Sequence, residues 1–175
     1  TKPEAPPLLE ERLLDRPVYV PLGSFYQVNP PVLQAMVAWL RGLVPAIGGD
    51  LLVDAYCGVG VFALALADRF TRAFGVEADA NAIAVARRNA RAWGYNHLDF
   101  RVGDAAAEVA ELALDGNSTV ILDPPRGGCA DELPMQLLAN APGTLVYIAC
   151  DPCSLARDLH CLRERFRLTH LALFN

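Results

Sequence analysis

Short apolar runs that alternate with longer amphipathic segments constrain the fold of this chain more than any other feature of its sequence. The apolar runs predict strands over residues 51–56, 72–78, 97–104, 118–125, 143–150 and 167–175. The segments between them predict helices over residues 61–70, 79–93, 105–113, 131–139 and 152–166. Continuous apolar strands that alternate with helices predict an α/β fold, with a doubly wound, mostly parallel sheet that is covered on both faces. The last strand reaches the end of the chain and is expected to be truncated.

A single domain is expected to follow a short lead-in. Residues 1–24 are dense in proline and predict an extended segment, whereas residues 25–175 are expected to form the domain. From Pro30 onwards apolar residues recur at helical spacing, so a helix is expected to end before Gly48. The first residue is Thr rather than Met, which indicates a fragment or a processed chain. No apolar run approaches the roughly 20 residues of a membrane span, so we expect no membrane partner and a cytoplasmic protein.

Charge and cysteine content narrow the class of protein. The net charge of −5 argues against a standalone nucleic-acid binder, but not against a catalytic domain that relies on another module for affinity. Apolar residues make up 53% of the chain, so disorder is not expected. The odd number of cysteines, 5, in such a core-forming chain favours reduced thiols in a cytosolic protein. The arginine-rich stretch 87–93 is expected to be a solvated helix face.

Glycines and acids follow successive predicted strands. Gly58 and Gly60 come after the first, Glu77 lies 19 residues beyond Gly58, and Asp104 and Asp123 follow the third and fourth. Ligands of such sheets bind at the carboxyl ends of the strands, and an acid after the second strand can accept hydrogen bonds from a ribose diol. The glycine spacing alone does not separate NAD from other nucleotides, and it also fits a simple tight turn.

The arrangement resembles the class I S-adenosylmethionine-dependent methyltransferases, which have a Rossmann-like fold. Four stretches resemble one branch more closely, the RNA uracil-5 methyltransferase family, and they occur in its order over about residues 22–175. The stretches are SFYQVNP (24–30), DAYCGVGVF (54–62), ILDPPRGG (121–128) and YIACDPCSLARDL (147–159). The resemblance implies an enzyme that makes 5-methyluridine in ribosomal or transfer RNA, with S-adenosylmethionine as cofactor and RNA as partner.

The resemblance also implies roles for individual residues. The implied cofactor-binding residues are Gln27, Tyr56, Gly58, Gly60, Glu77, Asp104 and Asp123. Glu77 would hold the ribose, and Asp104 would lie by the adenine. Asp123 would lie where the cofactor and the target base meet. Relatives often carry a polar Asn where this chain has Val61, which puts one cofactor contact in doubt. Arg126 would meet an RNA phosphate or bind a neighbouring carboxylate.

Cys150 matches the catalytic cysteine of that family. C5 of uracil is a poor nucleophile, and a thiolate that adds to C6 makes it reactive, which is covalent catalysis. Cys150 stands where an apolar run gives way to a helix, with Pro152 at a favoured first helical position. The partial positive charge of a helix N-terminus stabilises a thiolate, and Asp151 is expected to cap the helix. The alternatives are a buried structural thiol, a redox pair with Cys153 and a zinc site. We expect no metal, because only one cysteine pair has ligand spacing.

Two parts of the implied enzyme are not found in the sequence. Family members carry a glutamate base just after the strand expected at 167–175, and many carry an N-terminal RNA-binding barrel. We therefore expect weak RNA binding and little or no turnover from this chain alone. Two other functions stay open: a methyltransferase that acts on cytosine in RNA or on another substrate, and a non-catalytic module that binds the cofactor.

Overall fold

A computed structural model of the chain describes residues 7–23, 29–43, 48–130 and 132–175. Its strands are β1 (Leu8–Leu13), β2 (Arg16–Pro21), β3 (Gly49–Ala55), β4 (Phe70–Glu77), β5 (Leu98–Val102), β6 (Ser118–Leu122) and β7 (Thr144–Tyr147). Its helices are α1 (Pro30–Gly42), α2 (Val61–Leu66), a 3₁₀ turn (Ala67–Arg69), α3 (Ala80–Ala92), α4 (Ala105–Ala110), α5 (Glu132–Asn140) and α6 (Pro152–Leu162). Strands and helices alternate from β3 onwards, as the sequence predicts.

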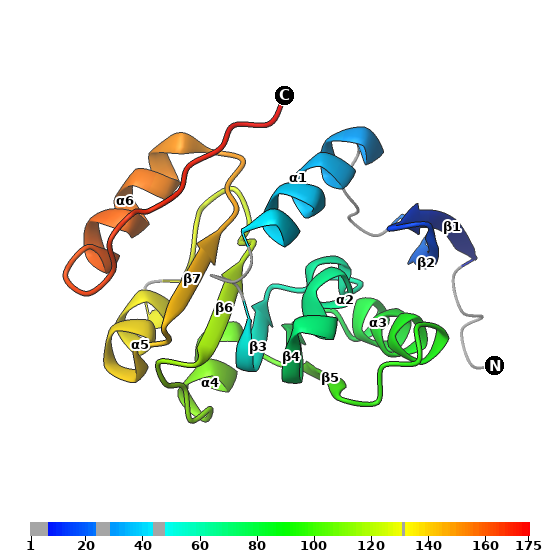
Figure 1. Cartoon of the computed structure of the whole chain (residues 1–175), viewed down its shortest axis with the longest axis horizontal. Coiled ribbons are helices and arrows are strands. Elements are labelled where there is room, and N and C mark those ends of the chain that lie inside the picture. The colour runs from blue at the N-terminus through cyan, green and yellow to red at the C-terminus, as the bar shows by residue number, and fades with distance from the viewer. Residues whose placement is uncertain (1–6, 24–28, 44–47, 131) are drawn as a thin grey trace.

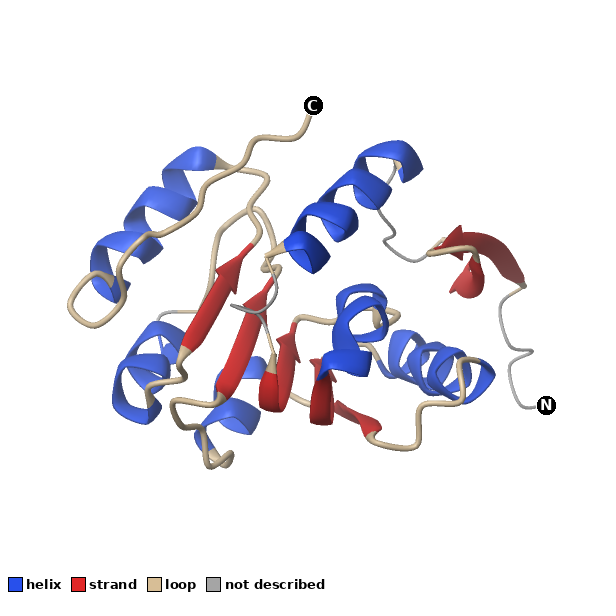
Figure 2. Cartoon of the chain, viewed as in Figure 1, coloured by secondary structure: helices blue, strands red, loops and turns tan. Residues whose placement is uncertain are grey.

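The centre of the molecule is a parallel sheet of five strands in the order β5-β4-β3-β6-β7 (Figure 2). The chain builds outwards from β3 through β4 to β5 and then returns to the other side of β3 with β6 and β7. This is the doubly wound arrangement, and the direction of winding reverses between β3 and β6, which is where ligands of such sheets bind at the carboxyl edge. The predicted fold class is therefore confirmed.

Each face of the sheet is covered by its own helices (Figure 1). Helices α1, α2 and α3 pack on one face, where Leu33, Phe62 and Ile83 belong to one buried cluster. Helices α4, α5 and α6 pack on the other, where Val109, Leu137 and Leu162 belong to a second cluster. Successive strand residues point to opposite faces, and both faces are apolar here because both are covered.

Three of the helices begin at aspartates that closely follow a strand. Asp79 accepts a hydrogen bond from the N–H of Asn81 at the start of α3, and Asp104 accepts one from Ala107 in α4. Asp151 accepts one from Ser154 at 2.7 Å at the start of α6. A side-chain oxygen at this position satisfies an N–H group that the helix leaves unpaired. The expected capping role of Asp151 is thus confirmed, and Asp79 and Asp104 cap their helices in the same way.

The proline-rich lead-in contains an antiparallel hairpin rather than a single extended segment. β1 pairs with β2, and the hairpin packs on α3. The buried Asn89 side chain accepts a hydrogen bond from the N–H of Tyr19 at 2.8 Å and donates to the Tyr19 carbonyl oxygen at 3.0 Å. The indole N–H of Trp93 donates to the Pro17 carbonyl oxygen. The stretch 87–93 is therefore only partly a solvated face, because the hairpin covers Asn89 and Trp93.

The final expected strand is wrong. Residues 163–175 contain no strand, and within the described chain β7 pairs only with β6. A strand needs a partner for its backbone groups, and this segment instead ends beside α1 (Figure 1). There the Phe174 ring meets the edge of Trp39 at 6.0 Å between centroids. In the described part of the chain, no helix is long and apolar enough to span a membrane.

Candidate active site

The carboxyl ends of the strands lie level with one another. Ala55 pairs with Val76 and with Leu122, and Leu122 pairs with Tyr147. The backbone ladder continues by one more step, since the N–H of Ile148 donates to the Leu122 carbonyl oxygen at 2.8 Å. The residues that follow these strands therefore meet at one edge, as the sequence predicts. They are Tyr56, Gly58 and Gly60 after β3, Glu77 at the end of β4, Asp104 after β5 and Asp123 after β6.

The turn after β3 is held by Glu77. The Gly58 N–H donates to one carboxylate oxygen at 3.2 Å, and the Asp79 N–H donates to the other at 3.0 Å. Gly60 has φ +87°, and a Cβ there would lie 2.6 Å from the Phe100 ring. This residue therefore has to be glycine, both for its left-handed backbone and for the close approach to the ring.

Asp54 lies beneath the same turn and is fully buried. One carboxylate oxygen accepts the N–H of Ala63 at 2.8 Å, near the start of α2, where Gly60 has no side chain to cap the helix. The other oxygen has no hydrogen-bond partner among the described residues. The pKa of Asp54 is raised to about 8, mainly by burial, which outweighs the Ala63 hydrogen bond, and in smaller part by the charges of Asp123 and Glu77.

The five cysteines differ sharply in their surroundings. Cys57 and Cys129 are buried, whereas Cys150, Cys153 and Cys161 are exposed. Burial raises the pKa of Cys57 well above its ordinary value and raises that of Cys129 to about 11. Both are thus disfavoured as thiolates. The alternative of a buried structural thiol is wrong for Cys150, whose side chain reaches solvent.

Cys150 lies in the connection between β7 and α6. The expected strand over 143–150 is shorter than predicted and ends at Tyr147, so Cys150 does not terminate it. It directly precedes Asp151, the N-cap of α6, and Cys153 lies in the first turn of that helix. In the described residues, no group of three or more His, Cys, Asp or Glu side chains is placed to hold a metal ion.

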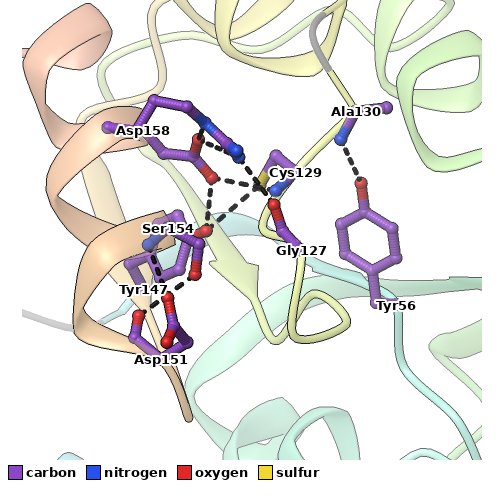
Figure 3. A network of polar contacts seen from close by, with 9 residues as sticks. Tyr56, Gly127, Cys129, Ala130, Tyr147, Asp151, Ser154 and Asp158 are labelled. Carbon is purple, nitrogen blue, oxygen red and sulfur yellow. Dashed lines mark hydrogen bonds and ion pairs between the residues drawn. The ribbon is translucent and has the colours of Figure 1, made fainter.

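The loop that follows β6 is fastened to its neighbours by a polar network (Figure 3). Asp158 of α6 accepts the N–H of Cys129 at 2.8 Å and the hydroxyl of Tyr147 at 2.5 Å. On the other side of the loop, the Ala130 N–H donates to the Tyr56 hydroxyl oxygen at 3.4 Å. The loop is therefore attached both to α6 and to the turn after β3.

The predicted site residues also include Gln27 and Arg126. Gln27 lies outside the described residues. Arg126 is exposed on the loop after β6, close enough to the start of α6 to act on Asp151. The Ser154 N–H and, more weakly, the Arg126 charge lower the pKa of the Asp151 carboxyl group. Both options for Arg126, an RNA phosphate or a neighbouring carboxylate, thus remain.

Sequence reasoning missed Asp158. Its signal was present, because the acid shares the face of α6 that carries Leu155 and Leu162, at spacings of three and four residues. An acid on the buried stripe of an amphipathic helix needs partners. The partners themselves, Cys129 and Tyr147, come from distant parts of the sequence and could not be read from the spacing.

Comparison with known proteins decides the family. A family model described as tRNA (uracil-5-)-methyltransferase matches residues 17–175. The chain belongs to this family. The resemblance drawn from the four sequence stretches is thereby confirmed.

Two relatives show how much of a longer protein the chain spans. The 23S rRNA (uracil(747)-C(5))-methyltransferase RlmC of Serratia proteamaculans is 36% identical over 95% of this chain and 44% of its own length. An uncharacterized RNA methyltransferase of Halalkalibacterium halodurans is 37% identical over 81% of this chain and 31% of its own. The chain thus spans less than half the length of these methyltransferases.

Solved structures agree with the fold. The tRNA (uracil-54, C5)-methyltransferase of Pyrococcus abyssi in complex with S-adenosyl-L-homocysteine has a TM-score of 0.76 and 34% identity, over 89% of this chain and 38% of that one. Trm5b of the same organism has a TM-score of 0.70 at 17% identity, over 92% of this chain and 47% of that one, which supports the Rossmann-like fold alone.

Proposed function

We propose that the protein is an S-adenosylmethionine-dependent RNA methyltransferase that acts on C5 of uridine in ribosomal or transfer RNA, with Cys150 as the nucleophile. One observation carries the proposal: Cys150 is exposed and follows β7 at the carboxyl edge of the sheet. Glu77, which ends β4, and Asp123, which follows β6, lie at the same edge. Family membership supports the reaction, and the P. abyssi complex supports the cofactor.

The residues at the edge of the sheet fit the proposed cofactor. Gly58 and Gly60 have no side chains that would keep a ligand from the backbone of this turn. Glu77 and Asp123 give this edge a negative potential that suits a cation. S-adenosylmethionine supplies a methyl group on a positively charged sulfur. Glu77 would accept hydrogen bonds from the ribose hydroxyls, and Asp104 would lie by the adenine. The proposed cofactor-binding set also includes Gln27 and Tyr56.

Cys150 would act on the target base. Its thiolate adds to C6 of the uracil, which pushes the ring electrons to O4 and makes C5 nucleophilic. C5 then takes the methyl group, and the electrons of the broken sulfur–methyl bond stay on the sulfur of the leaving S-adenosylhomocysteine. A base removes the C5 proton, and the electrons of that bond expel the thiolate from C6. The ring is restored and Cys150 is regenerated. The base must be extruded or already unpaired for the thiol to reach C6, and Arg126 is proposed to hold a phosphate of that RNA.

A trapped adduct tests this proposal. RNA with 5-fluorouridine at the target should become covalently attached to the protein in the presence of S-adenosylmethionine, because fluorine cannot leave C5 as a proton does. The trap precedes proton removal, so it does not depend on the base. C150A should lose the adduct entirely while its affinity for S-adenosylhomocysteine, measured by calorimetry, stays within about twofold of wild type.

C153A is the matched control, since this neighbouring thiol is also exposed. It should form the adduct at the wild-type rate. Adduct formation by C150A, or its loss in C153A alone, would falsify the assignment of the nucleophile. If wild type attaches to 5-fluorocytidine RNA and not to 5-fluorouridine RNA, the substrate is cytosine. Absence of any adduct, with cofactor binding intact, would leave the non-catalytic module.

A further inference from the structure

We propose that Asp158 is a positioning residue for this site. Together with Arg157 it holds the loop that carries Asp123 and Arg126 against helix α6, and so fixes that loop relative to Cys150 at the start of the same helix. We call residues 123–130 the Arg126 loop. This inference rests on the proposed function of Cys150, and it concerns a side chain that would touch neither the base nor the cofactor.

The Asp158 carboxylate joins two site segments. It is only 3% exposed. One of its oxygens accepts the N–H of Cys129 in the Arg126 loop at 2.8 Å and the hydroxyl of Tyr147 at the end of β7 at 2.5 Å. Hydrogen bonds to a charged acceptor are roughly twice as strong as neutral ones. A single carboxylate thus binds the loop, the strand before Cys150 and the helix after it.

Arg157, which is partly exposed, binds both Asp158 and the backbone of the Arg126 loop. Its guanidinium donates to the second Asp158 oxygen at 2.7 and 2.9 Å, which compensates the buried charge. The same guanidinium donates to the Gly127 carbonyl oxygen at 2.7 Å. The loop backbone therefore meets the pair twice, with the Gly127 carbonyl on the arginine and the Cys129 N–H on the aspartate.

Gly128 shows how closely the loop approaches. Its φ is +86°, and a Cβ there would lie 2.7 Å from an Asp158 oxygen and 3.2 Å from the Ser154 Cβ. Any side chain would push the loop away from α6, so glycine is required here. Ala130, the next residue but one, donates to Tyr56 at 3.4 Å, which sets the loop against the proposed cofactor turn as well.

Helix α6 links the position of the Arg126 loop to that of Cys150. Asp158 stands seven residues after the N-cap Asp151, which is about two turns along the same face of α6. Ser154, midway between them, is buried and bonded to Asp151 through both its N–H and its hydroxyl. A loop docked at Asp158 is therefore docked on a helix that begins directly after Cys150, and Arg126 of this loop is close enough to Asp151 to lower the pKa of its carboxyl group.

The test compares D158N with D68N. Asparagine keeps the shape of Asp158 but offers one accepting oxygen where two are used. At saturating RNA and cofactor, the rate constant of 5-fluorouridine adduct formation should fall about ten- to hundredfold in D158N. The affinity for S-adenosylhomocysteine should change by less than about threefold. D68N breaks the ion pair between Asp68 in the 3₁₀ turn and Arg41 in α1. It should leave the adduct rate of the folded protein unchanged.

Hydrogen exchange provides an independent measurement. The amides of Cys129 and Ala130 should exchange faster in D158N than in wild type, and at the wild-type rate in D68N. Unchanged exchange in D158N overturns the inference, as does a loss of adduct rate that D68N reproduces at equal folded fraction. If wild-type protein forms no adduct, the proposed role of Cys150 fails, whereas the exchange measurement still decides whether Asp158 holds the loop.

Discussion

Asp54 and Asp158 are both almost fully buried, yet the pKa values of their carboxyl groups are shifted in opposite directions. Asp54, under the turn after β3, accepts one hydrogen bond, and burial raises its pKa to about 8. At Asp158 burial also opposes ionisation, but hydrogen bonds from Tyr147, Cys129 and Arg157 outweigh it and lower the pKa. The comparison teaches that the number of donors, rather than the depth of burial, decides whether an acid on this sheet edge carries its charge.

The two sides of the site are therefore built differently. Around Asp158 the polar groups satisfy one another, so this side is closed and rigid. Around Asp54 one oxygen lacks a partner among the described residues, and the nearby acids Glu77 and Asp123 repel it. A positively charged ligand would relieve that repulsion, which fits the side where we propose that the cofactor binds.

The largest expected effect is the contrast between D158N and D54N at pH 7. D158N leaves a buried donor unsatisfied and weakens the Arg157 pair, so its free energy of unfolding should fall by about 2–3 kcal/mol. D54N keeps the Ala63 hydrogen bond, and the carboxyl group that it replaces is mostly uncharged at pH 7 because its pKa is about 8, so the loss should stay below about 1 kcal/mol. Urea unfolding curves measure both values. Equal losses would break the comparison.

The pH dependence of stability should separate the two acids further. The folded-state pKa of Asp54 lies above its ordinary 3.8. Its contribution to stability is therefore complete below about pH 4 and is lost as the pH rises towards 8. Asp158 has a lowered pKa, so its contribution is present above about pH 4 and is lost on acidification. Urea unfolding from pH 2 to 9 should show a flatter alkaline fall in D54N and a weaker fall below pH 4 in D158N. Unchanged profiles in the variants would contradict these signs.

The smallest expected effect belongs to Y147F. This change removes one of the donors to Asp158 and keeps the ring, so the free energy of unfolding should fall by about 0.5–1.5 kcal/mol. In the double variant with D158N, the losses should be less than additive, since both changes break the same hydrogen bond. Full additivity in the urea measurements would show that the hydrogen bond from Tyr147 to Asp158 contributes nothing to stability.

The sequence predicted the sheet well because its strands are buried on both faces. Such strands are continuous apolar runs, and the acids after them mark their carboxyl ends, as at Asp79 and Asp104. The short β7 was overestimated, because an apolar run continues through Ile148 and Ala149 whether or not the backbone stays paired. The last run, 167–175, has strand-like residues, but strand formation depends on a pairing partner that composition does not reveal.

The site was predictable where a residue follows a strand and hidden where it depends on tertiary contacts. Gly60, Glu77 and Asp123 could be placed from their positions after predicted strands. The Asp158 network joins residues that are far apart in the chain: 30 positions separate Gly127 from Arg157, and 29 separate Cys129 from Asp158. The hairpin on α3 was hidden for the same reason, because Asn89 meets Tyr19 across 70 residues.

The Phe100 ring has a consequence for how this fold can vary. It lies against Gly60, and a Cβ on Gly75 of the neighbouring strand would meet the same ring as well as the Cys57 sulfur at 3.0 Å. The residues that are acceptable at positions 60, 75 and 100 therefore depend on one another, because all three share the space of the Phe100 ring. A larger residue at position 75 becomes acceptable only together with a smaller one at position 100. Substitutions in this part of the core should thus occur in pairs, whereas residues on the exposed surface of α3 can be substituted singly.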